Sequence, residues 1–334
     1  MASAKWVLVL AIAGLQPACT PEEAVIPPPR NSLVQMGEAL FKDVRLGADG
    51  RTSCATCHIS AHAFSDAHAV SIGAFGREGT RNSPSLIGLL EQGPQFWDGR
   101  EETLAQAVLQ PLGNPREMGH DSVTAAVQHI AALPEYRRFF GPQISEADLS
   151  EALSSYLLQL DPGPSPYDRA RAAGDMALLG AQAQRGLQLF QGKAQCASCH
   201  LTEAESAFSD GRHHHASVGF ERIAGNIRSL QSRLEQTRAA GEPLGKVILA
   251  DTEIAELGRF AVTSDPQDMG AFRTPSLRNV ARTAPYMHDG SIQTLDAAIE
   301  HELYYRGLAS GQPISLTVEE RRELLAFLEA LSTP

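Results

Sequence analysis

The sequence predicts a mainly α-helical protein built from two duplicated helical domains that pack face to face. Three observations lead to this prediction. The pentapeptide Cys-x-x-Cys-His occurs twice, well separated along the chain. Short motifs around each pentapeptide also occur twice, which indicates a duplicated domain rather than a solenoid. The clearest hydrophobic periodicity has the period of a helix, and no stretch shows sustained strand alternation.

The N-terminus predicts export from the cytoplasm. Residues 1–18 read as a signal peptide, because a basic residue precedes an apolar run that is too short to span a bilayer. Residues 19–30 are rich in proline and predict an extended tether. Cys19 stands where a bacterial lipoprotein is lipidated, but Leu15 lies one position too early for that signal. A lipid anchor at Cys19 and an ordinary cleaved signal both stay open.

Each pentapeptide has the chemistry of a covalent haem c site. Two cysteines can form thioethers with the haem vinyl groups, and the adjacent histidine can reach the iron. A zinc site or redox disulfides are the alternatives, but neither explains a histidine directly after both motifs. The sequence therefore predicts two covalent haem c groups, attached through Cys54, Cys57 and His58 and through Cys196, Cys199 and His200.

The repeat also predicts the domain boundaries. Motifs between residues 84 and 104 recur 191 residues later, whereas the haem motifs lie 142 residues apart, so the second copy holds an insert of 49 residues. A charged stretch at 226–238 within it predicts a solvated helix. The Pro- and Gly-rich run 161–166 is a strong breaker. We expect one haem domain at 31–165 and a second at 166–334.

Each copy begins and ends with a predicted helix. Gly37 stands four residues before a phenylalanine ahead of the first haem motif, and Gly186 does so ahead of the second. A small residue here would let the terminal helices of a cytochrome c-like domain cross closely. Capping signals at Ser145 and Thr317 open an amphipathic helix at the end of each copy. The formal charge of −11 makes nucleic acid an unlikely partner class.

Several longer motifs are more specific than the haem motifs. They are Arg81-Asn82-Ser83-Pro84-Ser85-Leu86, Phe96-Trp97-Asp98-Gly99-Arg100, Glu117-Met118-Gly119, Arg273-Thr274-Pro275-Ser276-Leu277-Arg278-Asn279-Val280 and Thr283-Ala284-Pro285-Tyr286-Met287-His288-Asp289-Gly290. With them, residues 33–332 resemble the bacterial dihaem cytochrome c peroxidases and their MauG-type relatives. The resemblance implies a peroxide site at the haem of His58 and an electron-transfer site at the haem of His200.

The resemblance also implies roles for single residues. Trp97 matches the tryptophan between the haems, a relay for electrons, although core packing would explain it too. Glu117 matches the distal acid, and cleavage of peroxide needs a group that moves a proton between its two oxygens. Asn82, Thr283 and Pro285 match an interdomain calcium site, whose oxygen ligands suit that ion.

Two departures from the family pattern bear on function. Peroxidase members carry a capping histidine sixteen residues after the first haem histidine, where this chain has Ala74. His62 and His68 could replace it, but their positions in a polar loop explain them as well. We therefore expect the first haem to be open when oxidised, as in the MauG type.

The second departure concerns the sixth ligand of the second haem. Fourteen residues after the His-Asp-Gly histidine, peroxidases have methionine and the MauG type has tyrosine, whereas this chain has Glu302. A shift of the helix would bring a neighbour to the iron. The candidates are Tyr305, Tyr304 and His301, with Met287 and Met269 as outsiders.

Three functions follow from these observations. The first is a periplasmic peroxidase that reduces hydrogen peroxide with electrons from a small cytochrome c or a cupredoxin. The second is a MauG-type oxidase that uses peroxide to oxidise residues of a protein substrate. The third is an electron carrier without a substrate, which Glu117 and Ala74 disfavour. A homodimer is compatible with all three.

Overall fold

The structure is a computed structural model that describes residues 30–90, 92–161, 163–203 and 207–333. The predicted signal peptide (1–18) and the possible anchor at Cys19 lie outside these residues. The predicted tether does so too, except for Arg30, with which the first helix begins. About half of the chain is helical, and the described strands are only three or four residues long. None of the helices in the described ranges is both long and apolar enough to cross a membrane.

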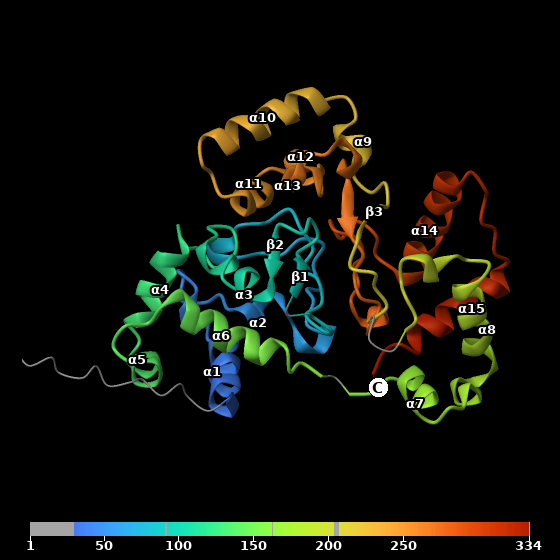
Figure 1. Cartoon of the computed structure of the whole chain (residues 1–334), viewed down its shortest axis with the longest axis horizontal. Coiled ribbons are helices and arrows are strands. Elements are labelled where there is room, and N and C mark those ends of the chain that lie inside the picture. The colour runs from blue at the N-terminus through green and yellow to red at the C-terminus, as the bar shows by residue number, and fades with distance from the viewer. Residues whose placement is uncertain (1–29, 91, 162, 204–206, 334) are drawn as a thin grey trace, which may run out of the picture.

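The N-terminal part (residues 30–161) packs around the crossing of its first and last helices. Its elements are α1 (Arg30–Lys42), α2 (Cys54–Cys57), β1 (Gln92–Gln95), β2 (Glu101–Thr103), α3 (Leu104–Ala107), α4 (Val123–Ala131), α5 (Pro134–Phe140) and α6 (Glu146–Leu157). Helices α1 and α6 cross at Gly37. If alanine replaced this glycine, its methyl group would lie 2.0 Å from the carbonyl oxygen of Ala152. The close crossing predicted at this glycine is therefore confirmed. Figure 1 shows this part in blue and green.

The C-terminal part (residues 163–333) repeats that crossing. Its elements outside the insert are α7 (Pro166–Ala172), α8 (Gly180–Gln191), β3 (His213–His215), β4 (Ala271–Arg273), α14 (Leu295–Ser310) and α15 (Val318–Glu329). A methyl group on Gly186 in α8 would lie 2.0 Å from the carbonyl oxygen of Glu323 in α15. This part has its own buried cluster of apolar side chains, with Phe190, Phe208 and Phe327 packed edge to face.

The predicted capping signals open the two terminal helices as expected. Ser145 and Asp148 form a reciprocal capping box at the start of α6. Thr317 and Glu320 do the same at the start of α15. Each box satisfies backbone N–H groups that the first turn of a helix leaves without partners.

The insert lies within residues 220–269 and forms a small helical unit with a third apolar cluster. It contains α9 (Phe220–Ile223), α10 (Ile227–Ala239), α11 (Leu244–Ala250), α12 (Thr252–Ala255) and α13 (Phe260–Thr263). The predicted solvated helix is α10, but only one of its faces is solvated, because Leu230 and Leu234 are buried against α11 to α13. In Figure 1 these helices, coloured gold to orange, lie over the N-terminal part.

In the described part of the chain, eight short 3-10 helices shape the connecting loops. They are η1 (Val44–Leu46), η2 (Ser60–His62), η3 (Ala74–Gly76), η4 (Pro111–Gly113), η5 (Met176–Leu179), η6 (Cys196–Ser198), η7 (Pro266–Asp268) and η8 (Val280–Arg282). Strand β1 pairs with β2, and β3 pairs with β4, both antiparallel. The 3-10 helices hold several of the predicted site residues, among them Ala74 in η3 and Cys196 in η6.

Candidate functional site

The two Cys-x-x-Cys-His motifs have the same hydrogen-bonding arrangement. His58 Nδ1 bonds the carbonyl oxygen of Phe64 at 3.0 Å, and His200 Nδ1 bonds that of Phe208 at 2.8 Å. Because a carbonyl only accepts, each ring carries its proton on Nδ1, which leaves the Nε2 lone pair for a metal. Burial lowers the pKa of His58, and it lowers the pKa of His200 to about 4. Both rings are therefore neutral at pH 7, as metal ligation requires.

The four motif cysteines fit haem attachment better than the alternatives. None of them is in a disulfide. Among the described residues, no cluster of potential metal ligands contains two of these cysteines, which argues against a zinc site built from them. Burial raises the pKa of Cys54, Cys57 and Cys196 to about 12, so these thiols are protonated.

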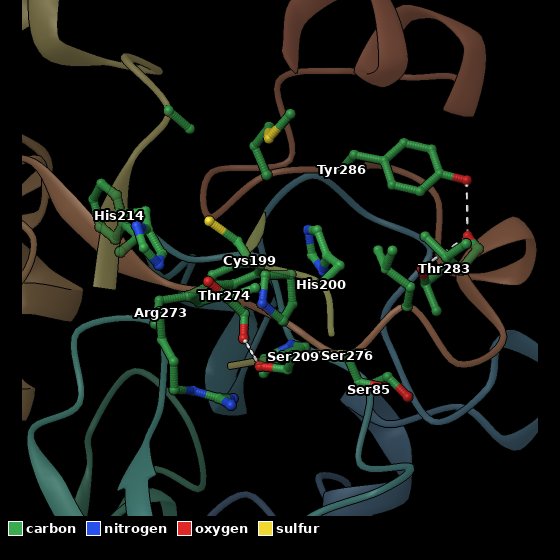
Figure 2. Close-up of a pocket in the computed structure, with 18 of the residues that line it drawn as sticks. Ser85, Cys199, His200, Ser209, His214, Arg273, Thr274, Ser276, Thr283 and Tyr286 are labelled. Carbon is green, nitrogen blue, oxygen red and sulfur yellow. Dashed lines mark hydrogen bonds between the residues drawn. The ribbon is translucent and has the colours of Figure 1, made fainter. Parts of the chain in front are cut away.

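A cavity of about 400 Å³ surrounds His200. Figure 2 shows Cys199 and His200 near its centre, with His214 and Arg273 on one side and Tyr286 and Thr283 on the other. Much of the remaining lining is apolar and comes from α8, α14, α15 and the loop after β4; it includes Phe190, Leu277, Val280, Leu295, Ile299, Leu303, Leu324 and Leu328. An apolar cavity with a neutral histidine and two thiols fits a haem group, which is large, flat and mostly apolar.

Glu117 lies in the loop between η4 and α4, close to the first motif. Its Oε2 atom is buried and has no hydrogen-bond partner. Burial raises the pKa of Glu117 to about 7, and the charge of Arg100 opposes this effect. The carboxylate in turn contributes to the raised pKa of Cys54 and Cys57. A carboxyl group that titrates near neutral pH beside the first motif can take up and release a proton there.

Ala74 lies directly against the Glu117 loop. Its N–H donates to the carbonyl oxygen of Glu117 at 2.7 Å, and its side chain is fully buried. The alternative histidines differ in setting: His68 is exposed and pairs with Asp66 at 2.8 Å, and His62 ends η2. The methyl side chain of Ala74 offers no ligand atom at this position.

Trp97 connects the two parts of the molecule. Its indole Nε1 donates to the carbonyl oxygen of Asn82 at 2.8 Å, and its own carbonyl accepts from the N–H of Arg273 at 2.8 Å. Trp97 also lines the cavity around His200. Asn82, Thr283 and Pro285, the predicted calcium ligands, border the same cavity. All four residues thus border one cavity that is lined by both parts of the molecule.

The predicted sixth ligands of the second haem do not line the cavity around His200. His301 Nε2 donates to the carbonyl oxygen of Ala216 at 2.7 Å, Tyr304 is 62% exposed, and Tyr305 borders a separate hollow. The face of α14 that lines the cavity instead carries Glu302 and, one turn later, Arg306. Met287 also reaches the cavity.

Sequence reasoning missed two buried charged groups near the site. Arg100 pairs with Asp98 at 2.9 Å and lies 3.6 Å above the ring of Phe96. Glu256 in the insert pairs with His288 at 2.8 Å. Arg100 belongs to a motif that the sequence analysis quoted, but Glu256 lies in the insert, where the repeat offers no matching position.

Comparisons with known proteins agree with this geometry. A family model described as "Di-haem cytochrome c peroxidase" matches residues 31–177. The "Methylamine utilization protein MauG" of Methylorubrum extorquens is 33% identical over 326 residues, which cover 92% of this chain and 82% of that protein. The "Cytochrome-c peroxidase IdrP1" of Denitromonas iodatirespirans is 34% identical over 315 residues, which cover 90% of this chain and 81% of that protein.

Solved structures have the same fold. The crystal structure of a MauG-like protein associated with microbial copper homeostasis matches with a TM-score of 0.69 and 30% identity, covering 94% of this chain and 95% of that one. The diheme peroxidase BthA from Burkholderia thailandensis matches with the same TM-score at 24% identity, covering 92% of this chain and 87% of that one.

Proposed function

Because this chain belongs to the di-haem cytochrome c peroxidase family and is a peroxidase-type oxidoreductase, we propose that it reduces hydrogen peroxide to water with electrons from a small redox protein. The donor would be a small cytochrome c or a cupredoxin. Residues 31–165 and 166–334 would form the two duplicated haem domains, and the protein would work in the periplasm.

The two motifs would hold one haem c each. His58 and His200 would bind the irons through Nε2, and Cys54, Cys57, Cys196 and Cys199 would form the thioethers. Haem iron supplies the electron transfer that the reduction of peroxide requires. Asn82, Thr283 and Pro285 would hold one calcium ion where the two parts meet, and Trp97 would carry electrons between the haem sites.

The observation that carries the proposal is the buried, unpartnered carboxyl oxygen of Glu117. With a pKa raised to about 7 by burial, Glu117 can accept the proton of one peroxide oxygen and return it to the other, which leaves as water. Ala74, whose N–H donates to the backbone carbonyl of Glu117, has no side-chain atom that could cap an iron held by His58. A general acid–base group of this kind contributes about 10²- to 10⁴-fold to a rate.

For the second haem, the lining of the cavity favours Glu302 over the three ligands expected from the sequence. Glu302 occupies the position where family members have methionine or tyrosine, and it shares the cavity with His200. Met287 lines the same cavity and is the second candidate; the matching residue of the N-terminal copy is Phe96, which has no ligand atom. We propose Glu302 as the sixth ligand.

Turnover with a reduced small cytochrome c tests the function. We expect peroxide-dependent oxidation of the donor by the dihaem protein, without prior reduction of the enzyme. Denaturing gels stained for haem test covalent attachment. The double variant Cys54→Ala/Cys57→Ala should lose the covalently bound haem of the first motif and keep that of the second. Absence of donor oxidation in a preparation with two haems per chain would refute the peroxidase proposal.

A MauG-type oxidase is the second candidate. It is favoured because Glu302 and Ala74 stand where peroxidase members of the family have a methionine and a histidine. In that case peroxide would be consumed only with a protein substrate, and reduced cytochrome c would not serve. The electron carrier without a substrate would show no reaction with peroxide at all.

A further inference from the structure

The loop that carries Glu117 is held together by Asn114. The Asn114 carbonyl accepts from the backbone N–H of Glu117 at 3.1 Å and from that of Gly119 at 3.0 Å. Its side-chain Oδ1 accepts from the N–H of Arg116 at 2.9 Å. Asn114 is only 4% exposed, so its remaining polar group, the Nδ2 amide, needs a partner within the protein.

That partner belongs to the insert, more than a hundred residues away in the sequence. Asn114 Nδ2 donates to the carbonyl oxygen of Gly245 at 3.4 Å. The next residue, Lys246, donates from Nζ to the carbonyl oxygen of Asp121, at the other end of the loop. Two adjacent residues at the start of α11 therefore hold the Glu117 loop on both sides.

The same turn of α11 also packs against Arg100, the charge that opposes the effect of burial on Glu117. A methyl group on Gly245 would lie 3.3 Å from Arg100 Nε. The absence of a side chain at Gly245 therefore leaves room for the guanidinium group. The first turn of α11 thus contacts the Glu117 loop and Arg100, the cation that acts on its carboxyl group.

The insert is itself anchored, so α11 has a defined position. Thr80 Oγ1 donates to the carbonyl oxygen of Ile248 at 2.8 Å, and Arg81 donates to that of Ala255. On the other side, Glu256 pairs with His288 of the C-terminal part at 2.8 Å. In Figure 1, α11 lies directly over the N-terminal part.

We propose that the insert is a positioning element for the peroxide site, and that Lys246 is the residue through which it holds the Glu117 loop in place. This inference rests on the proposed role of Glu117. The C-terminal half of the chain thereby completes the acid–base site of the N-terminal half. Lys246 touches no reacting group, and it acts only through the backbone of Asp121.

The experiment compares Lys246→Met with wild type, as the protein with both haems bound. Lys246→Arg is the conservative variant, since it keeps a donor. Lys193→Met is the matched control, because Lys193 also forms an ion pair, with Glu320, but within the C-terminal part. Two readouts are needed: hydrogen exchange of the 114–121 segment by mass spectrometry, and the rate of reaction with hydrogen peroxide.

We expect Lys246→Met to raise exchange at the amides of Glu117 and Gly119 by about fivefold, as expected for losing one hydrogen bond. The peroxide rate should fall by roughly tenfold, because misplacement of a reacting group is costly. Lys246→Arg should restore both, and Lys193→Met should change neither. Unchanged exchange and rate in a folded Lys246→Met protein would overturn the inference.

The two readouts separate this inference from the proposed function. If wild type does not react with peroxide, the proposed function fails, but the exchange measurement still tests whether Lys246 holds the loop. If the peroxide reaction proceeds and Lys246→Met leaves exchange unaltered, only the positioning role fails.

Discussion

Replacing Glu117 by glutamine tests the acid–base site most directly. Glutamine has nearly the same shape as glutamate but cannot bind and release a proton near neutral pH. The rate constant for reaction with peroxide should fall by about 10²-fold or more. This corresponds to about 2.7 kcal/mol of activation free energy. The haem content should not change, because Glu117 is not a predicted attachment residue.

The raised pKa of Glu117 also predicts an effect on stability. Its pKa is about 7 in the folded protein, against an ordinary value of 4.5. The folded state therefore binds the proton more tightly, so the contribution of this group to stability is complete below about pH 4.5 and is lost as the pH rises through 7. The shift corresponds to roughly 3 kcal/mol as an upper limit. Glu117→Gln, which cannot ionise, should be more stable than wild type at pH 8 and about equal at pH 4.

Stopped-flow absorbance of the haem band between pH 5 and 9 gives the rate, and calorimetry gives the stability. In wild type the rate should rise through about pH 7, because only the ionised carboxylate can accept the first proton. In Glu117→Gln the profile should be flat in this range. A rate within about threefold of wild type, in protein with full haem content, would remove Glu117 from the mechanism.

Four further predictions concern the rest of the molecule. Gly186→Ala should lower the free energy of unfolding by about 1–3 kcal/mol, because its methyl group would meet the backbone of α15, whereas Gly225→Ala, with open space around it, should change it little in the same calorimetric scan. Low-temperature EPR of the oxidised protein should show one high-spin and one low-spin ferric signal, since Ala74 cannot cap the first haem; two low-spin signals would contradict this. Glu302→Gln should shift the low-spin signal and leave the high-spin one unaltered, and an unshifted signal would exclude Glu302 as a ligand. Chelation of calcium should lower the melting temperature, and Asn82→Ala should abolish this response; a melting temperature that chelators do not change would argue against the ion.

Much of the fold could be predicted because its signals are local. The capping boxes at Ser145 and Thr317 depend on residues within one turn, and the structure has both of them. The close crossings at Gly37 and Gly186 could be predicted because only the smallest residue lets two helix backbones approach so far. The resemblance then located Glu117 and Trp97, which the structure places beside the first motif and between the two parts.

The rotation of α14 about its own axis, which decides the side chains that line the cavity, could not be predicted in this way. Successive residues of a helix point about 100° apart, so an error of one residue turns a ligand away from the cavity. The position fourteen residues after His288 is Glu302. The prediction chose its neighbours instead, because tyrosine and histidine are more usual haem ligands than glutamate. Packing of α14 against the cavity decides that Glu302 lines the cavity around His200, while Tyr304 is exposed.

The sequence by itself determined the two Cys-x-x-Cys-His motifs, the repeat and the terminal helices, because each depends on residue identity at short and regular spacing. The candidate acid came from the family resemblance. Only the tertiary structure decided which side chain of α14 enters the cavity and where the insert lies. The insert has no counterpart in the repeat, and its contacts with Asn114 and Asp121 join residues more than a hundred positions apart. Such contacts follow from how separate apolar clusters pack together, which no local pattern encodes.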